Sequence, residues 1–426
     1  MIAVIMAGGK GTRIASVNSD VPKPMIPIGG KPILEYTIEM LEKQGYREII
    51  LVIGHLGEII RNYFQDGSKW NVSVSYIVED TPLGTAGALF FLKDKIDSDF
   101  LLINGDIIFD VDIHKFYECH KRNNCVATIL THPNSHPYDS GLIVAEKDGR
   151  VIRWLAKEDE RMWYRNRVNA GLHMLSPKVF ERFATLQKVD LDRDILKQLI
   201  PEGELYIYDS PEYVKDMGTP DRYEAVSRDL ETGRVAQRNL LRKQRAIFLD
   251  RDGTINKYIG FLRNIEEFEL IDGVAEAIRD INESGYLAIV ITNQPVIARG
   301  DVTVEELREI HNKMETLLGR EGAYVDDIFY CPHHPHSGYE GEIKELKIDC
   351  SCRKPKPGML LEAAEKYNID LHNSWMVGDG DNDMLAGMAA GCKAAGVGNA
   401  VTLDNVPIYG SLKECITQIL KDEMQA

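Results

Sequence analysis

Residues 246–254 read Ala-Ile-Phe-Leu-Asp-Arg-Asp-Gly-Thr, and this stretch decides the fold of the second half of the chain. The four apolar residues predict a short buried strand, and two aspartates follow it at positions i and i+2. Both carboxylates should therefore lie at the carboxyl end of a strand. Open α/β sheets bind their ligands at this edge.

Short apolar strands alternate with amphipathic helical stretches on both sides of this point. Residues 3–6, 48–53 and 287–292 are almost entirely apolar, with only Glu48 and Thr292 as polar ends, whereas residues 32–44 and 273–284 carry apolar side chains at helical spacing. Continuous apolar strands are covered on both faces. The expected fold class is therefore α/β, with mostly parallel sheets between helices.

The length of 426 residues predicts two or three domains, at roughly 100–200 residues each. We expect one domain over residues 1–232, a basic linker over 233–244 and a second domain over 245–426. The favoured interpretation of the basic stretch Arg234–Arg245 is a solvated connector helix; the alternative is a phosphate-binding face.

The composition excludes some classes of partner. The net charge of −16 gives the protein no bulk attraction for nucleic acid or anionic lipid. No apolar run approaches the roughly 18 residues of a membrane helix, and residues 1–6 read as a buried strand, not a signal peptide. The 7 cysteines suggest reduced thiols and a metal site, so we expect a cytoplasmic protein.

Glycines follow the first strand, in Gly8-Gly9-Lys10-Gly11-Thr12-Arg13. Such glycines let the backbone approach a phosphate, although a tight turn explains them equally well. Lys23 stands between two prolines, and Asp106 and Asp216 each follow a predicted strand. Two such carboxylates could share one Mg²⁺, which also takes phosphate oxygens and water.

Together these residues resemble the sugar-1-phosphate nucleotidyltransferases over roughly residues 1–230. The resemblance implies a Rossmann-like fold and attack of a sugar phosphate oxygen on the α-phosphorus of a nucleotide. It implies catalytic roles for Arg13 and Lys23, and Mg²⁺ ligands in Asp106 and Asp216. The residues it assigns to the nucleotide are Gly8, Gly9, Gly11, Thr12, Arg13, Glu79, Gly84 and Thr85.

The segment Leu83-Gly84-Thr85-Ala86-Gly87 is similar to that of guanylyltransferases. A carboxylate only accepts hydrogen bonds, and guanine offers adjacent N1–H and N2–H₂ donors, so we expect Glu79 to read guanine. The alternative is a surface glutamate in a loop.

On the sugar side, Gly141 and Asn169 match family positions, and Lys157 is expected to bind the sugar phosphate. The family's usual glutamate before this lysine is Ala156 here, which leaves the sugar open.

The second half resembles the haloacid dehalogenase phosphatases over roughly residues 245–425, which makes the expected fold two Rossmann-like, doubly wound parallel-sheet domains. By resemblance Asp250 is the nucleophile and Asp252 the general acid and base. Mg²⁺ is assigned to Asp250, the backbone carbonyl of Asp252, and Asp379. The residues assigned to the phosphoryl group or substrate are Thr292, Asn293, Arg353 and Lys354.

Three cysteines and one histidine have the spacing of a structural zinc site. The expected ligands are Cys331, His333, Cys350 and Cys352, with His334 or His336 as alternative ligands. Cys119, Cys125, Cys392 and Cys415 are expected to be ordinary buried thiols.

This cysteine motif is similar to that of the zinc-containing heptose 1,7-bisphosphate phosphatases, and the histidinol phosphatases share it. Pro295 and Val296 replace the family's Ser-Gly, and Gly380 replaces a lysine. The two resemblances together imply a bifunctional enzyme that converts heptose 1,7-bisphosphate to heptose 1-phosphate and joins this to GMP from GTP.

Alternatives remain open. One is a mannose-1-phosphate guanylyltransferase fused to a histidinol-phosphatase-like or other sugar phosphatase, and another is a binding protein with inactive sites. The expected partners are GTP and heptose phosphates, and we expect no binding to nucleic acid or membrane. The sequence does not decide whether the chain forms a homo-oligomer.

Overall fold

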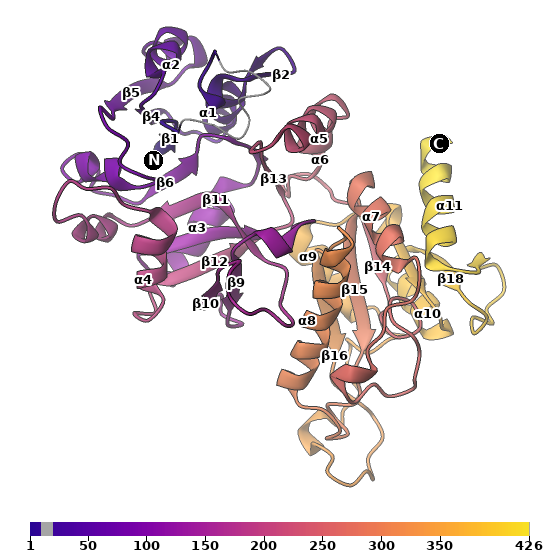
Figure 1. Cartoon of the computed structure of the whole chain (residues 1–426). Helices are drawn as coiled ribbons and strands as arrows, with labels where there is room; N and C mark the ends of the chain where they lie inside the picture. Colours follow the sequence, from indigo (N-terminus) through magenta and orange to yellow (C-terminus); the bar gives the residue numbers. More distant parts are fainter. Residues whose placement is uncertain (10–19, 426) are drawn as a thin grey trace. The chain divides into compact units, whose positions relative to one another are not determined.

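A computed structural model describes residues 1–9 and 20–425, and the chain forms two compact units (Figure 1). The first unit comprises Met1–His132, Ile143–Leu155 and Asn169–Asn239. The second comprises Pro133–Leu142, Ala156–Val168 and Leu240–Ala426. Two short segments of the first half of the chain therefore pack with the second half.

The first unit contains a nine-stranded sheet in the order β10-β9-β11-β6-β1-β4-β5, with β8 between β11 and β12. Its strands are β1 (Ile2–Met6), β4 (Glu48–Ile53), β5 (Ser73–Val78), β6 (Phe100–Asn104), β8 (Ala127–His132), β9 (Leu142–Ala145), β10 (Val151–Leu155), β11 (Val168–Leu175) and β12 (Leu205–Asp209). β1 runs parallel to β4 and β6, whereas β11 runs antiparallel to β6, so this sheet is mixed.

Helices cover both faces of this sheet. Successive side chains of β1 point to opposite faces: Ala3 and Ile5 join an apolar cluster with α1, and Val4 joins a second cluster on the other face. The helices are α1 (Ile33–Lys43), α2 (Gly57–Phe64), α3 (Ile113–Asn123), α4 (Lys197–Leu199), α5 (Pro220–Glu231), α6 (Arg234–Gln237) and the π-helix η7 (Leu191–Leu196). Two further strand pairs are β2 (Pro27–Ile28) with β3 (Lys31–Pro32), and β7 (Ile107–Asp110) with β13 (Tyr213–Asp216).

The expected solvated connector helix is wrong. The helix breaks at Gly233, whose φ of +74° is left-handed, and α6 is only one turn long. Arg234 pairs with Asp229 at 3.0 Å, and Arg238 is buried and donates to the carbonyl of Pro211 at 3.2 Å. These arginines therefore belong to the packing of the first unit.

The second unit contains a six-stranded parallel sheet in the order β16-β15-β14-β17-β18-β19. Its strands are β14 (Ala246–Leu249), β15 (Leu287–Asn293), β16 (Asp327–Cys331), β17 (Trp375–Gly378), β18 (Lys393–Val397) and β19 (Ile408–Tyr409). Its helices are α7 (Val274–Ser284), α8 (Val304–Arg320), α9 (Gly358–Tyr367), α10 (Asp381–Ala390) and α11 (Leu412–Gln425).

Alternate side chains of β14 pack against different helices. Ile247 and Leu249 join α7, α8 and α11, whereas Ala246 and Phe248 join α9 and α10. The sheet therefore lies between two helical layers, and the predicted α/β class is confirmed for both units.

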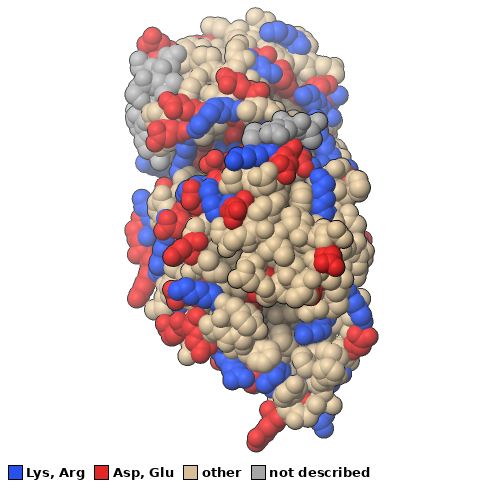
Figure 2. Space-filling view, turned by 90° about the vertical axis from the view of Figure 1, so that its right-hand side faces the viewer, with Lys and Arg blue, Asp and Glu red and all other residues tan. Residues whose placement is uncertain are grey.

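No helix in the described ranges is long and apolar enough to cross a membrane. On the face drawn in Figure 2, basic and acidic side chains are interspersed.

Candidate active sites and metal centre

Three predicted residues of the first unit come together in the structure. Lys23, at the start of a short 3₁₀ helix (Lys23–Met25), forms an ion pair with Asp106, which follows β6. The pairing of β7 with β13 places Asp216 opposite Ile107, and the amide of Met217 donates to the carbonyl of Asp106 at 3.0 Å. The two aspartates predicted to share Mg²⁺ therefore belong to one site.

Arg222 is a site residue that the sequence did not reveal. Its Nη1 donates to both oxygens of Asp216, at 2.9 and 2.8 Å, and the amide of Gly218 donates to Oδ1 at 2.8 Å. Burial opposes ionisation of Asp216, but the Arg222 charge and these hydrogen bonds hold its pKa below the usual value. Asp216 is thus an anion that could share a cation with Asp106.

Glu79 lies directly beside the glycines after β1. A Cβ placed on Gly8 would lie 2.6 Å from Glu79 Oε2, so the Glu79 carboxylate lies against the backbone of Gly8. The amide of Leu83 donates to Glu79 Oε1 at 3.2 Å, and burial raises the pKa of Glu79. Among the described residues, none has an atom within 4 Å of a Cβ placed on Gly9. The predicted residues Gly11, Thr12 and Arg13 lie outside the described part of the chain.

The segment after Glu79 is anchored on η7. Gly84 has a φ of +83°, and a Cβ there would lie 2.4 Å from the carbonyl oxygen of Val189. Thr85 Oγ1 accepts a hydrogen bond from the amide of Leu191 at 2.7 Å. The Thr85 hydroxyl is thus used within the protein.

Asn169, at the second position of β11, is held by its neighbours. Its Oδ1 accepts from the amide of Gly171 at 3.1 Å and lies 3.1 Å from His173 Nε2, while its Nδ2 donates to Asp192 at 3.3 Å. Burial and neighbouring Asp190 raise the pKa of Asp192 to about 6. The other predicted sugar-side residues, Gly141 and Lys157, lie in the two segments that belong to the second unit.

The second unit has a pocket at the carboxyl ends of β14, β15 and β17. The predicted residues that line it are Asp250, Asp252, Thr292, Asn293, Arg353, Lys354 and Asp379. The three departures from the family pattern, Pro295, Val296 and Gly380, also line it. The structure therefore brings the predicted phosphatase residues together.

Lys354 is the central cation of this pocket. Its side chain is 2% exposed, and its Nζ lies 2.7 Å from Asp250 Oδ1 and 2.6 Å from Asp383 Oδ1. It also donates to the carbonyl of Ile291 at 2.7 Å. A buried charge is stable only when it is paired and hydrogen-bonded, as Lys354 is here.

Asp250, Asp379 and Asp383 form a group that fits a divalent cation. One carboxylate oxygen from each lies within 4.8 Å of the others. Burial and nearby carboxylates raise the pKa of Asp250 to about 7 and that of Asp379 to about 6. Mg²⁺ prefers such oxygen ligands, and its charge would favour their ionised forms.

Asp252 is excluded from that group, and its side chain contacts Arg251. Arg251 Nη2 lies 2.9 and 2.8 Å from the two Asp252 oxygens. Burial opposes ionisation of Asp252, but the Arg251 charge holds its pKa below the usual value. Arg251 was not predicted as a site residue.

Asn293 and Arg353 support the loop that carries Lys354. Asn293 exchanges two hydrogen bonds of 3.1 Å with the backbone of Lys354. Arg353 Nη1 donates to the carbonyl of His333 at 3.2 Å and so connects the pocket to a cluster of sulfur ligands. Any contact of these two residues with substrate remains a prediction.

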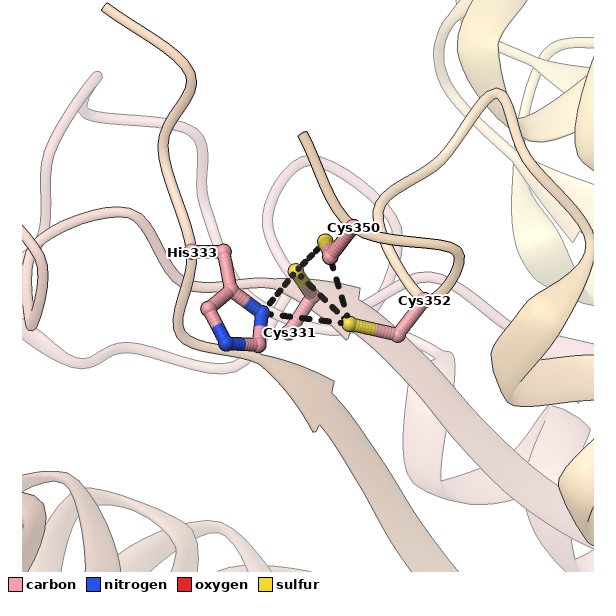
Figure 3. A group of neighbouring side chains, drawn as sticks. All are labelled: Cys331, His333, Cys350 and Cys352. Atoms are coloured by element: carbon pink, nitrogen blue, oxygen red, sulfur yellow. Dashed lines mark hydrogen bonds between the residues drawn. The ribbon is translucent and has the colours of Figure 1, made fainter. Parts of the chain in front are cut away.

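Cys331, His333, Cys350 and Cys352 face one another around a common centre (Figure 3). The three Sγ atoms are separated by 3.5, 3.3 and 3.2 Å, too far for a disulfide, and His333 Nδ1 lies 3.3 Å from Cys352 Sγ. Ligands about 2.3 Å from one tetrahedral zinc would be roughly 3.8 Å apart. The group therefore fits a tetrahedral metal ion after a small expansion.

The alternative histidine ligands lie elsewhere. His334 Nδ1 is 3.0 Å from the carbonyl of His336, and neither ring joins the cluster. The other four cysteines, Cys119, Cys125, Cys392 and Cys415, are free and buried, as predicted.

Comparison with known proteins gives two matches to family models. Residues 2–233 match the Nucleotidyl transferase family, and residues 351–406 match the HAD-hydrolase-like family. A D-glycero-beta-D-manno-heptose-1,7-bisphosphate 7-phosphatase from Yersinia pestis is 46% identical over 145 residues, covering 34% of this chain and 75% of that protein. The enzyme of the same name from Haemophilus influenzae is 44% identical over 166 residues, covering 39% and 85%.

Among solved structures, HddC from Yersinia pseudotuberculosis, complexed with GMP-PN, is 30% identical with a TM-score of 0.47. The match covers 54% of this chain and 99% of HddC.

Proposed function

Since the chain belongs to the nucleotidyl transferase family and to the D-glycero-β-D-manno-heptose-1,7-bisphosphate 7-phosphatase family, we propose that it catalyses two consecutive steps of sugar-nucleotide synthesis. The second unit removes the 7-phosphate of heptose 1,7-bisphosphate. The first unit then transfers GMP from GTP to heptose 1-phosphate, giving GDP-heptose and pyrophosphate. The proposal is carried by the presence, in one chain, of two phosphate sites whose reactions follow each other.

In the first unit, Lys23, Asp106 and Asp216 form the proposed transfer site. A sugar phosphate oxygen attacks the α-phosphorus of GTP and pyrophosphate leaves, so no covalent enzyme intermediate is needed. Catalysis then consists of positioning and charge neutralisation, which the Lys23 ammonium provides. Asp106 and Asp216 would hold Mg²⁺, which supplies further positive charge at the phosphates.

Glu79 is the proposed reader of guanine. Its Oε1 accepts from the Leu83 amide, and its carboxylate lies beside Gly8, two residues after the end of β1. A carboxylate there would accept the N1–H and N2–H₂ donors of guanine and would repel a base that presents acceptors.

In the second unit, Asp250 is the proposed nucleophile. Its carboxylate attacks phosphorus, the bond to the sugar oxygen breaks, and Asp252 gives that oxygen a proton. A water molecule then attacks the aspartyl-phosphate, gives a proton to Asp252 and releases phosphate. Lys354 neutralises charge beside the nucleophile, and Asp250, Asp379 and Asp383 would hold Mg²⁺, which reduces repulsion between carboxylate and phosphate.

The Cys₃His cluster is proposed to hold structural zinc. It joins the end of β16 to residues 350–352, immediately before Arg353 and Lys354, so the metal would fix the loop that carries these side chains. Metal analysis should find about one zinc per chain. Cys350→Ser should lower this content, whereas Cys392→Ser, a buried thiol outside the cluster, should not. Equal zinc in all three proteins would contradict the assignment.

A coupled assay with heptose 1,7-bisphosphate and GTP tests the whole proposal by following phosphate, pyrophosphate and GDP-heptose. Asp250→Asn should abolish phosphate release but leave transfer to supplied heptose 1-phosphate intact. Loss of both activities would contradict two separate sites. Faster transfer to mannose 1-phosphate than to heptose 1-phosphate would support the alternative mannose enzyme.

A further inference from the structure

Arg251 stands between the two catalytic aspartates in sequence, but its side chain is 0% exposed and lies inside the second unit. Its Nη2 contacts both oxygens of Asp252, and its Nε lies 3.2 Å from Oδ1. Gln294 Nε2 donates to Asp252 Oδ2 at 2.8 Å, and Asn256 Nδ2 donates to Oδ1 at 3.0 Å. Donors on both oxygens fix the plane of this carboxylate, because rotation would break several hydrogen bonds at once.

Arg251 is itself held by two acceptors. Its Nη1 lies 3.2 Å from Nε2 of His311, a buried residue of α8, and its Nη2 donates to Gln294 Oε1 at 3.0 Å. Burial and the Arg251 charge lower the pKa of His311 to about 3, so the ring is neutral and Nε2 can accept. The guanidinium thus has partners on both sides, and α8 is connected to the catalytic carboxylate.

We propose that Arg251, oriented by His311 and Gln294, is a positioning residue that aims the Asp252 carboxyl group at the leaving oxygen of the phosphatase substrate. The inference rests on the proposed phosphatase mechanism. In the structure Asp252 is a carboxylate that accepts from these donors, so the proton it gives is the one it takes from the attacking water in the preceding turnover. When the bond between phosphorus and the sugar oxygen breaks, that proton must reach the oxygen as the Asp250–phosphorus bond forms. A carboxyl group held in one plane delivers this proton without first having to reorient.

The test compares two leaving groups. A sugar alkoxide needs a proton to leave, whereas p-nitrophenolate leaves readily without one. In Arg251→Lys, which keeps the charge but loses the forked contact, kcat/KM for heptose 1,7-bisphosphate should fall about 10- to 100-fold. The value for p-nitrophenyl phosphate should change by less than about 3-fold, because its departure depends little on general acid catalysis.

His311 provides a second variant that leaves Arg251 in place. His311→Leu removes the acceptor for Nη1 and should show the same selective loss, at smaller size. His311→Gln supplies a side-chain oxygen as acceptor for Arg251 and should recover most of the kcat/KM for heptose 1,7-bisphosphate. Arg308→Lys, on the exposed side of α8, is the matched control and should behave as wild type, and thermal melting of each variant monitors folding.

Equal losses for both phosphates, or no loss for either, would overturn the positioning role. Asp252→Asn is the reference, compared by kcat/KM because this quantity covers the steps up to departure of the leaving group and not the later attack of water. Equal falls in kcat/KM for the two phosphates would show that the proposed acid is wrong. A wild-type protein inactive on both phosphates would instead refute the proposed phosphatase, and the role of Arg251 with it.

Discussion

At the scale of the residue, Glu79 is the proposed determinant of which base the first unit accepts. Glu79→Gln replaces a carboxylate that only accepts hydrogen bonds with an amide that also donates. The variant should therefore use GTP less well and UTP better than the wild-type protein. The ratio of kcat/KM for GTP to that for UTP should fall roughly 10- to 100-fold, the value of one hydrogen bond to a charged group. The exposed neighbour Asp80→Asn is the control, and an unchanged ratio in Glu79→Gln would defeat the idea.

Lys354 is the second residue whose removal has a definite consequence. Lys354→Met would leave Asp250 and Asp383 close together and buried without their cation. Breaking a buried ion pair costs about 3–5 kcal/mol, so the second unit should unfold more easily at neutral pH, and phosphate release should be lost. Added Mg²⁺ should recover part of the stability if the carboxylates bind it. Unchanged unfolding and phosphate release would contradict the central position of Lys354.

The sequence predicted the site residues that lie in a recognisable catalytic or metal-ligand motif. Asp250, Lys354 and the cysteine cluster follow strand ends or have ligand spacing, and the structure brings each group together. Arg222 and Arg251 were not predicted, because each is part of a site only through its contact with an aspartate. The sequence does not show that these side chains meet. Spacing also left His333, His334 and His336 as possible ligands. All three are close enough along the chain, and the sequence does not tell which side chain points towards the cysteines.

At the scale of the element, β16 links a buried ion pair to the Cys₃His cluster. It begins at Asp327, which lies 2.8 Å from Lys366 and 2.7 Å from the hydroxyl of Tyr367, and it ends at the cluster ligand Cys331. Burial opposes ionisation of Asp327, but the charges of Lys366 and Arg165 lower its pKa to about 2. The start of the strand is thus fixed by a carboxylate that is ionised at neutral pH.

Asp327→Asn tests this contribution through its pH dependence. The pKa falls from 3.8 in the unfolded chain to about 2 in the folded one, so the ionised form stabilises the fold at higher pH. This stabilisation, about 2 kcal/mol, should be complete above pH ~5 and lost as the pH falls towards 2. The free energy of unfolding of wild type and variant should therefore converge in acid. A constant difference would contradict the assignment.

Local sequence patterns predicted the strands and major helices, but not every irregular element. The connector helix was expected from its charge pattern, yet Gly233 ends it and Arg238 is buried. The π-helix η7 gives no periodic signal over Leu191–Leu196, and the amide of its first residue, Leu191, donates to Thr85, which is distant in sequence. Such contacts join distant residues and are not readable from a local window.

At the scale of the whole molecule, the second unit is assembled from three stretches of chain. Residues 133–142 and 156–168 pack with it although they precede residue 240 by far. The amide of Tyr164 donates to Thr316 Oγ1 at 2.9 Å, and the amide of Asn166 donates to Glu315 at 3.0 Å. Hydrophobic periodicity locates elements but does not tell which unit a polar loop joins, so this arrangement was not predicted.

Arg167 anchors the second of these segments, and its replacement tests whether the segment is part of the unit. Its side chain is 2% exposed, lies 3.3 Å from Glu315 and donates to the carbonyl of Asp326 at 2.7 Å. Arg167→Met would leave Glu315 buried without its cation, which costs about 3–5 kcal/mol. The unfolding transition of the second unit, followed by loss of phosphate release on heating, should move to lower temperature. Arg153→Met, on the exposed side of β10, should leave it unchanged. If Arg167→Met melts like wild type, the upstream segments contact the second unit without stabilising it. If it melts at a lower temperature, the stability of the phosphatase depends on residues that precede its own first strand.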